Sequence, residues 1–304
     1  MRTSRTSYPS SASSRVKRPL AACRLGRFGR FVAAGIGVLA AGAASAQGGP
    51  GDLLVAPTRI VLEGRQRTAE VTLVNTGSAR ATYRISFVNL RMNELGGTSE
   101  IEASGARPGE QFADQLVRYS PRQVTLEPQV AQTVRMQLRL PADLPPGEYR
   151  SHLLFRAIPP VEAAKGPAEG DSEFSVQLTA IYGISIPVIV RHGETSATAT
   201  LSDLELVASD PAESAPTLRF RIHRTGDRSL YGNLTATYYP PGGQPVVVGM
   251  ANGVAIYTPN PTRSAGIQLH VPPGIALRKG RIHLAFTRQE KGNETIAEAD
   301  LPVP

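Results

Sequence analysis

The feature that most constrains this chain is a row of apolar residues that recurs at every second position: Phe174, Val176, Leu178 and Ala180. That period is typical of a β-strand with one buried face and one face in water. From Ile181 to Val190 the run is almost continuously apolar, as in a strand that is covered on both faces. The alternation alone favours a strand that packs in the chain's own core. A strand of this length could also lend its first half to another polypeptide.

Six shorter runs of the same kind precede it, at residues 53–62, 69–74, 81–88, 117–126, 131–140 and 149–158. Turn-forming residues such as Asn75 and Gly77 separate these runs, and Pro57 interrupts the first of them. Residues 92–115 read as a loop or a hairpin. About seven short strands, with a turn roughly every 8–12 residues, predict an immunoglobulin-like β-sandwich.

The strand pattern breaks at residues 191–194, and we place a domain boundary there. Strand-like runs then resume at residues 197–207, 217–223, 232–239, 246–250, 267–271, 281–287 and 295–301. The polar run at residues 223–232 reads as a turn, or as a hairpin tip that faces a partner. The predicted fold class is all-β, with two immunoglobulin-like β-sandwich domains in tandem, at residues 47–192 and 193–304.

Residues 1–46 have the order of a secretory signal peptide. They contain eight basic residues and no acidic one, then an apolar run at residues 31–44, and then Ala-Ser-Ala at residues 44–46. The apolar run is shorter than the about 20 residues that a membrane-spanning helix needs. The sequence therefore predicts cleavage after Ala46, export to the periplasm and no stable insertion in a membrane.

The net charge of +8 points at first to a nucleic-acid or membrane partner. Without the eight basic residues of the signal peptide, 25 basic residues stand against 25 acidic ones, so the mature chain is neutral. We therefore expect no nucleic-acid partner. The single cysteine, Cys23, lies in the presequence. The mature chain thus has no disulfide, and its stability must come from packed cores.

The residues that carry chemistry in enzymes do not form recognisable motifs here. The five histidines never occur at metal-ligand spacing with each other. No glycine-rich phosphate loop follows a strand, and no serine stands in a nucleophile elbow. The sequence predicts no enzyme, no metal site and no cofactor.

Several short segments of the first half recur together in one known family. They are residues 57–61 (Pro-Thr-Arg-Ile-Val), 71–77 (Val-Thr-Leu-Val-Asn-Thr-Gly), 119–122 (Tyr-Ser-Pro-Arg), 126–128 (Leu-Glu-Pro), 133–135 (Thr-Val-Arg) and 155–160 (Phe-Arg-Ala-Ile-Pro-Pro). In this order, after a signal peptide, residues 53–190 resemble the N-terminal domain of the periplasmic chaperones of chaperone–usher pilus assembly. The second half does not resemble the better-known members closely.

The resemblance implies a function for the long strand. In that family it inserts into a pilin or fimbrial subunit that lacks its own last strand, and the chaperone delivers this subunit to an outer-membrane usher. The donated side chains would then be Phe174, Val176, Leu178 and Ala180. Main-chain hydrogen bonds and pockets for alternate side chains explain such binding.

The resemblance also implies an anchor for the carboxylate at the end of the client, for which the family uses a basic pair. Arg59 matches the arginine of that pair, although it could also be a solvated arginine on a strand. The partner lysine would fall at Tyr182 or Gly183, and neither residue is basic. Arg59 therefore works alone, or Arg156 or Arg191 reaches in, or the client is anchored differently.

Two other functions compete with the chaperone. A tandem immunoglobulin-like adhesion or surface-binding protein is the first of them. An exported enzyme is the second, and the lack of catalytic motifs disfavours it.

Overall fold

The computed structural model describes residues 52–159, 181–207, 215–288 and 294–304. By its internal contacts the chain divides into residues 1–45 and residues 46–304, and every described residue belongs to the second unit. The predicted signal peptide lies outside the described residues, and so does the apolar row Phe174, Val176, Leu178 and Ala180. Within the described ranges, no helix is long and apolar enough to cross a membrane.

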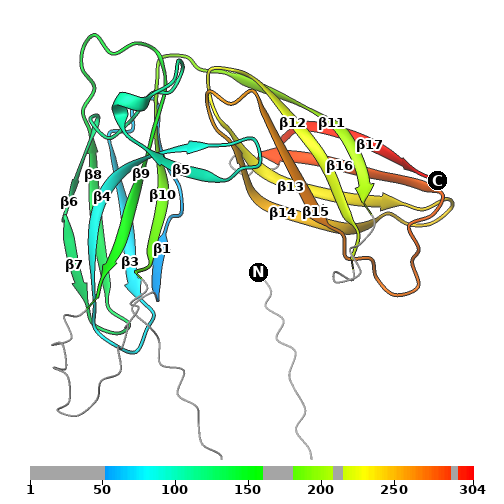
Figure 1. Cartoon of the computed structure of the whole chain (residues 1–304), viewed down its shortest axis with the longest axis horizontal. Coiled ribbons are helices and arrows are strands. Elements are labelled where there is room, and N and C mark those ends of the chain that lie inside the picture. Colours follow the sequence, from blue (N-terminus) through cyan, green and yellow to red (C-terminus); the bar gives the residue numbers. More distant parts are fainter. Residues whose placement is uncertain (1–51, 160–180, 208–214, 289–293) are drawn as a thin grey trace, which may run out of the picture. The chain divides into compact units, whose positions relative to one another are not determined.

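Two sheets form the first sandwich. The smaller sheet has the order β1 (Leu53–Ala56), β3 (Thr68–Asn75), β8 (Ala131–Leu138) and β6 (Val117–Ser120). The larger sheet has the order β2 (Ile60–Leu62), β10 (Gly183–His192), β9 (Gly147–Ile158), β4 (Ala81–Met92) and β5 (Thr98–Ile101), and β7 (Gln123–Leu126) pairs with the first half of β4. Figure 1 shows β4, β9 and β10 side by side.

Two prolines divide predicted strands between these sheets. Pro57 separates β1 from β2, and Pro121 separates β6 from β7. In each case the strand before the proline lies in the smaller sheet and the strand after it in the larger sheet. A proline cannot donate a hydrogen bond to a sheet, so the chain leaves one sheet there and joins the other.

Alternate residues of both sheets meet in one core. Tyr83, Phe155, Met136 and Val188 are among its fully buried side chains, with at most 2% of their surface exposed. The Tyr119 hydroxyl donates a hydrogen bond to the backbone oxygen of Ile85, at 3.0 Å. The period-two pattern of the sequence thus corresponds to burial.

The second sandwich also has two sheets. One has the order β11 (Ala197–Val207), β12 (Thr217–Gly226) and β15 (Thr262–Gln268), and the other has β14 (Val246–Ile256), β13 (Leu230–Tyr239), β16 (Gly280–Arg288) and β17 (Glu294–Val303). Phe220, Tyr238 and Phe286 are buried between them. The predicted all-β class with two immunoglobulin-like sandwiches is confirmed.

The sequence predicted a loop or a hairpin at residues 92–115, and the hairpin is present, since β5 pairs antiparallel with the end of β4. A short 3-10 helix follows at Ala103–Gly105, and Arg91 fixes this segment through two hydrogen bonds of 2.6 Å to Glu110.

The bounds of two strands differ from the prediction by five residues or more. Strand β14 extends to Ile256, six residues beyond the predicted end at Met250. Strand β15 begins at Thr262, five residues before the predicted start at Ile267. Because Ile267 is the only fully buried residue of β15, the strand has no apolar alternation that the sequence could reveal.

Candidate functional site

The two faces of β9 have different environments. Tyr149, Leu153 and Phe155 belong to the core of the first sandwich. Because side chains alternate along a strand, the residues between them point to the opposite face of the larger sheet, which we call the outer face. On β9 the outer face carries Glu148, Arg150, His152, Leu154 and Arg156.

The edge of β10 that faces away from β9 is open over half of its length. Residues 183–192 pair with β9, whereas only residues 188–190 pair with β2. At residues 183–187 no other strand of the described part pairs with that edge. Directly before it, the apolar side chains of Ile181 and Tyr182 are 58% and 61% exposed. An open edge beside exposed apolar residues is a template for pairing with another chain.

Arg59 stands at the point where this open edge ends. It directly precedes Ile60, the first residue of β2, which pairs with Val188. Ile60 is buried in the core, so the alternation places Arg59 on the outer face. The guanidinium carbon of Arg59 lies 4.5 Å from the centroid of the Tyr231 ring, within the range of a cation–π contact.

Arg150 is a buried cation on the same face as the partly buried Arg59, and the sequence prediction missed it. It lies directly across from Ile189 of β10, and its guanidinium carbon is 4.1 Å from the centroid of the Tyr257 ring. Its Nε and Nη1 atoms are buried and have no hydrogen-bond partner in the described ranges. Burial lowers the pKa of Arg150, and Arg59 lowers it further to a smaller extent. A guanidinium remains charged even so, and these donors suit a carboxylate.

His152 lies beside Arg150 on the outer face, and we call Arg59, Arg150 and His152 the basic cluster. The His152 ring adds no charge to it. Its ring centroid lies 6.2 Å from that of Tyr257, edge to face, and its Nδ1 atom has no hydrogen-bond partner in the described part of the chain. Burial, and then the charges of Arg150 and Arg59, lower the pKa of His152 to about 3. The positive charge of the cluster therefore comes from the two arginines alone.

Arg191 lies near this cluster but is neutralised by two carboxylates. Its Nε donates to Glu148 at 3.0 Å, and its Nη1 donates to Glu63 at 2.9 Å. The Oε2 atom of Glu148 that Arg191 bonds also accepts a hydrogen bond from the backbone N–H of Ser229, in the turn between β12 and β13, and Oε1 accepts one from the Ser229 hydroxyl. Arg191 is therefore a structural residue, and the polar run at residues 223–232 contains a turn that holds Glu148.

Arg156, the other arginine that could have joined Arg59, lies too far away. It is exposed and lies six residues after Arg150 on β9, which is about 20 Å along a strand. Directly opposite it on β4 is Arg84, which is also exposed. Among the described residues of the outer face, Arg150 is thus the arginine that shares the region of Arg59 and is not paired with a carboxylate.

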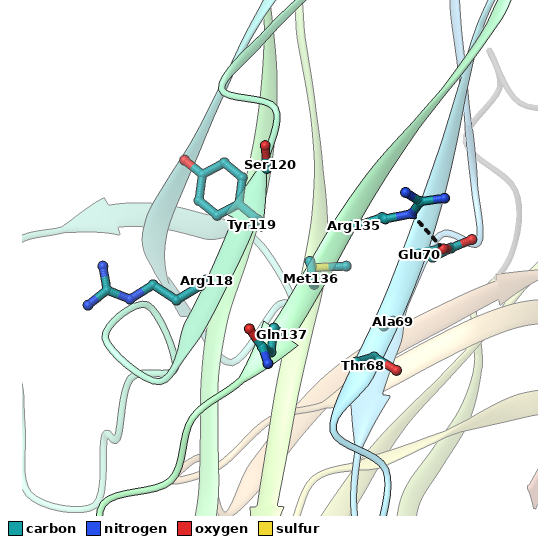
Figure 2. A pocket seen from close by; sticks show the side chains of 9 residues that line it. All are labelled: Thr68, Ala69, Glu70, Arg118, Tyr119, Ser120, Arg135, Met136 and Gln137. Carbon is teal, nitrogen blue, oxygen red and sulfur yellow. Dashed lines mark hydrogen bonds and ion pairs between the residues drawn. The ribbon is translucent and has the colours of Figure 1, made fainter.

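The outer side of the smaller sheet is different. A hollow of about 590 Å³ lies over β3, β8 and β6. In it Arg135 points to Glu70, with Nε and Oε1 3.0 Å apart, whereas Arg118 points away from this pair (Figure 2). The Arg135–Glu70 pair is largely exposed and its charges compensate each other, so it leaves no charge for a ligand.

Catalytic and metal-binding arrangements are likewise missing from the described ranges. No group of three His, Cys, Asp or Glu side chains there could hold a metal ion. Ser202 and His223 are 2.7 Å apart, but no carboxylate of the described residues bonds the other nitrogen of His223. A serine nucleophile needs a histidine that is oriented by a third group.

No family model matches this chain, and no curated protein matches it. Among solved structures it is similar to the YadV chaperone, at 11% identity with a TM-score of 0.41 over 83% of this chain and 100% of that one. It is also similar to the CupB2 chaperone of Pseudomonas aeruginosa, at 11% identity with a TM-score of 0.42 over 83% and 100% of the two chains.

A third similar structure is the CsuC–CsuE complex of a chaperone and a tip adhesion subunit, from archaic Csu pili of Acinetobacter baumannii. It has 12% identity and a TM-score of 0.39 over 83% of this chain and 97% of that one. Each of these three structures is described as a chaperone or as a complex that contains one. At such identities and TM-scores the likeness does not establish a function, so the function of this chain has to follow from its own residues.

Proposed function

We propose that this chain is a periplasmic chaperone that binds pilus or fimbrial subunits by strand addition and delivers them to an outer-membrane usher. The observation that carries this proposal is the open edge of β10, which ends at Arg59. A subunit with an incomplete sheet exposes an apolar groove and an unpaired edge of its own. Pairing of the two edges would supply the main-chain hydrogen bonds that each edge lacks, as in other cases of strand addition.

The geometry of the open edge favours one direction for the added strand. Because β2 occupies the edge from Val188 onward, a strand that pairs beside residues 183–187 must end near Arg59. If it runs parallel to β10, its carboxyl end meets Arg59. An antiparallel strand would bring a positively charged amino end there instead. A guanidinium favours the carboxylate, so we infer a parallel added strand.

Arg150 replaces the missing lysine in this proposal. It lies across β10 from Arg59, and its Nε and Nη1 atoms have no hydrogen-bond partner in the described ranges. Buried guanidinium nitrogens that make no hydrogen bond are costly, and a carboxylate removes that cost through charge-assisted hydrogen bonds. We propose that Arg59 and Arg150 together anchor the carboxyl end of the client.

The donated residues of this proposal are Phe174, Val176, Leu178 and Ala180, which lie outside the described residues. They lie an even number of positions before Ile184 and Ile186, whose side chains face the core of the first sandwich. If the strand continues regularly upstream of β10, the row keeps that direction, and beyond the end of β9 it would fill the groove of a client. The export signal, cleavage after Ala46 and the domain boundary after His192 belong to the same proposal, which includes no enzymatic activity.

The test is to isolate the mature chain, residues 47–304, from the periplasm of its native host together with whatever it binds. We expect a small β-rich subunit at one-to-one stoichiometry, and an outer-membrane usher at lower yield. Arg59→Glu and Arg150→Leu should each lower the amount of bound subunit by about tenfold or more, because each removes a charge-assisted hydrogen bond. Val176→Asp should do the same by placing a charge in the groove of the client.

Arg135→Leu is the matched control, since it removes an arginine from the smaller sheet. It should leave the amount of bound subunit unchanged, and circular dichroism should show every variant folded. If the wild type binds no subunit, the chaperone proposal is wrong, and the alternative of an adhesion or surface-binding protein is favoured. If Arg59→Glu and Arg150→Leu both bind as well as the wild type, the carboxylate anchor is wrong.

A further inference from the structure

We propose that Arg156 selects clients that carry an acidic side chain four residues before their last residue. This inference rests on the proposed strand addition, because it uses the register of the added strand on β10. The observations that carry it are the Arg84–Arg156 pair, the charges on the outer face and the position of Gly183.

Arg84 of β4 and Arg156 of β9 lie directly opposite each other and are both exposed. Like charges in this position repel each other and weaken a sheet. No ion pair joins either arginine to an acidic residue of the described ranges. The neighbouring positions on the outer face hold Thr82, Ser86 and Leu154, which carry no charge. The pair is thus positively charged and uncompensated within the described part of the chain.

The same sign of charge continues along the outer face of the larger sheet. Among the described residues of β4, β7, β9 and β10, the only carboxylate is Glu148, which is buried and bonded to Arg191 and Ser229. Glu100 of β5 is exposed, but it pairs with Leu90 near the other end of β4. The part of the outer face that β4, β7, β9 and β10 form around the Arg84–Arg156 pair therefore has arginines and no exposed carboxylate, which favours a negatively charged partner and speeds its approach. The bias of the smaller sheet is weaker, because Glu70 compensates Arg135 there and only Arg118 of its strands is left without a carboxylate partner in the described ranges.

Gly183 opens a path from Arg156 to the open edge. It pairs with Arg156, so it lies between that arginine and the position of an added strand. Since Gly183 has no side chain, the space where a Cβ would stand is empty, and its nearest neighbours are the tip of the Leu154 side chain at 3.1 Å, the backbone oxygen of Phe155 at 3.4 Å and the Cα of Arg156 at 3.8 Å. An added strand lies about 10 Å from β9, two strand spacings away, and extended arginine and glutamate side chains together cover that distance. Repulsion from Arg84 pushes Arg156 in this direction.

The register then identifies the residue of the client. If the last residue of the added strand lies beside Pro187, the residue beside Gly183 comes four positions earlier. Residues an even number of positions apart point to the same face of a strand, so both side chains point to the outer face. The residue three positions before the end points to the other face and cannot meet Arg156.

The experiment uses the whole mature chain and fluorescein-labelled decapeptides of alternating valine and threonine with a free carboxyl end. The peptides carry glutamate, glutamine or lysine four residues before the last, or glutamate three residues before it, and one glutamate peptide ends in an amide. Binding is measured by fluorescence anisotropy at about 20 mM and about 200 mM NaCl, because salt screens exposed charges. We expect a preference of about three- to tenfold for glutamate over glutamine at the fourth position, as exposed ion pairs provide.

Arg156→Gln should abolish this preference, and the glutamate three residues before the end should give none. The matched control is Arg118→Gln, which removes an exposed arginine of the smaller sheet and should leave the preference intact. If the peptides with a free carboxyl end bind but do not discriminate between glutamate, glutamine and lysine, the role of Arg156 is wrong and the chaperone proposal stands. If the amide peptide binds as tightly as the free acid, the carboxylate anchor is wrong, and the register that supports Arg156 is lost with it.

Discussion

At the scale of single residues, burial rather than residue type distinguishes the basic side chains of this protein. Arg150, Arg156 and Arg191 alternate with apolar neighbours in much the same way, and the sequence cannot separate them. In the fold, Arg191 is held between two carboxylates, Arg156 is exposed, and Arg150 is buried against Tyr257 without a hydrogen-bond partner for two of its nitrogens in the described part. Arg59 could be singled out from the sequence because a motif surrounds it.

His152 gives a prediction at the same scale. Its pKa of about 3 in the folded chain lies below the ordinary value near 6.5, so below pH 6.5 the unfolded chain binds a proton that the folded chain does not. Stability should therefore fall as the pH drops from about 6.5 towards 3. We expect the unfolding free energy from urea titrations to fall between pH 7.5 and pH 5 in the wild type. In His152→Gln this fall should be smaller by about 2 kcal/mol.

His270→Gln is the control for this measurement, because it makes the same substitution at an exposed histidine. An equal loss of stability on acidification in His152→Gln and the wild type would contradict the buried, neutral state of His152.

At the scale of elements, the sequence predicted most strands because their buried residues alternate, as in β3, β8 and β12. It also located the interruption at Pro57. It could not tell that β1 and β2 join different sheets, since that depends on partners distant in the chain. The open edge of β10 could not be predicted either, because a register between β10 and β2 has no local signature in the sequence.

Strand β13 provides a prediction at this scale. A Cβ atom added at Gly232 would lie 2.1 Å from the backbone oxygen of Thr287 on β16, which no side-chain rotation can relieve. Gly232→Ala should therefore lower the unfolding free energy by about 1–3 kcal/mol in urea titrations. Gly105→Ala is the control, since nothing lies within 4 Å of a Cβ there. Equal stability of the two variants would show that β13 and β16 are less closely paired than described.

At the scale of the whole molecule, one buried carboxylate links residues that are far apart in the chain. Glu148 of β9 accepts hydrogen bonds from Arg191 of β10 and from Ser229 of the β12–β13 turn. The Ser229 hydroxyl in turn accepts a hydrogen bond from the backbone of Thr258, at 3.2 Å. Arg150, which we assign to the client's carboxylate, lies two residues from Glu148 on the same face of β9. The network therefore fixes the surroundings of the proposed anchor.

Glu148→Gln tests this link, because the amide removes a negative charge from a buried site that contains Arg191. Loss of one partner of a buried ion pair typically costs about 3–5 kcal/mol, and the remaining pairing of Arg191 with Glu63 should reduce the cost to about 2–4 kcal/mol. We expect hydrogen exchange to show faster exchange at the amides of Ser229 and Thr258, with unchanged protection in β3 and β8. Glu70→Gln, which breaks an exposed pair, should cost less than about 1 kcal/mol. If Glu148→Gln is no more costly than Glu70→Gln, the carboxylate does not stabilise the fold, and the anchor arginines must be positioned by the tyrosines that they contact.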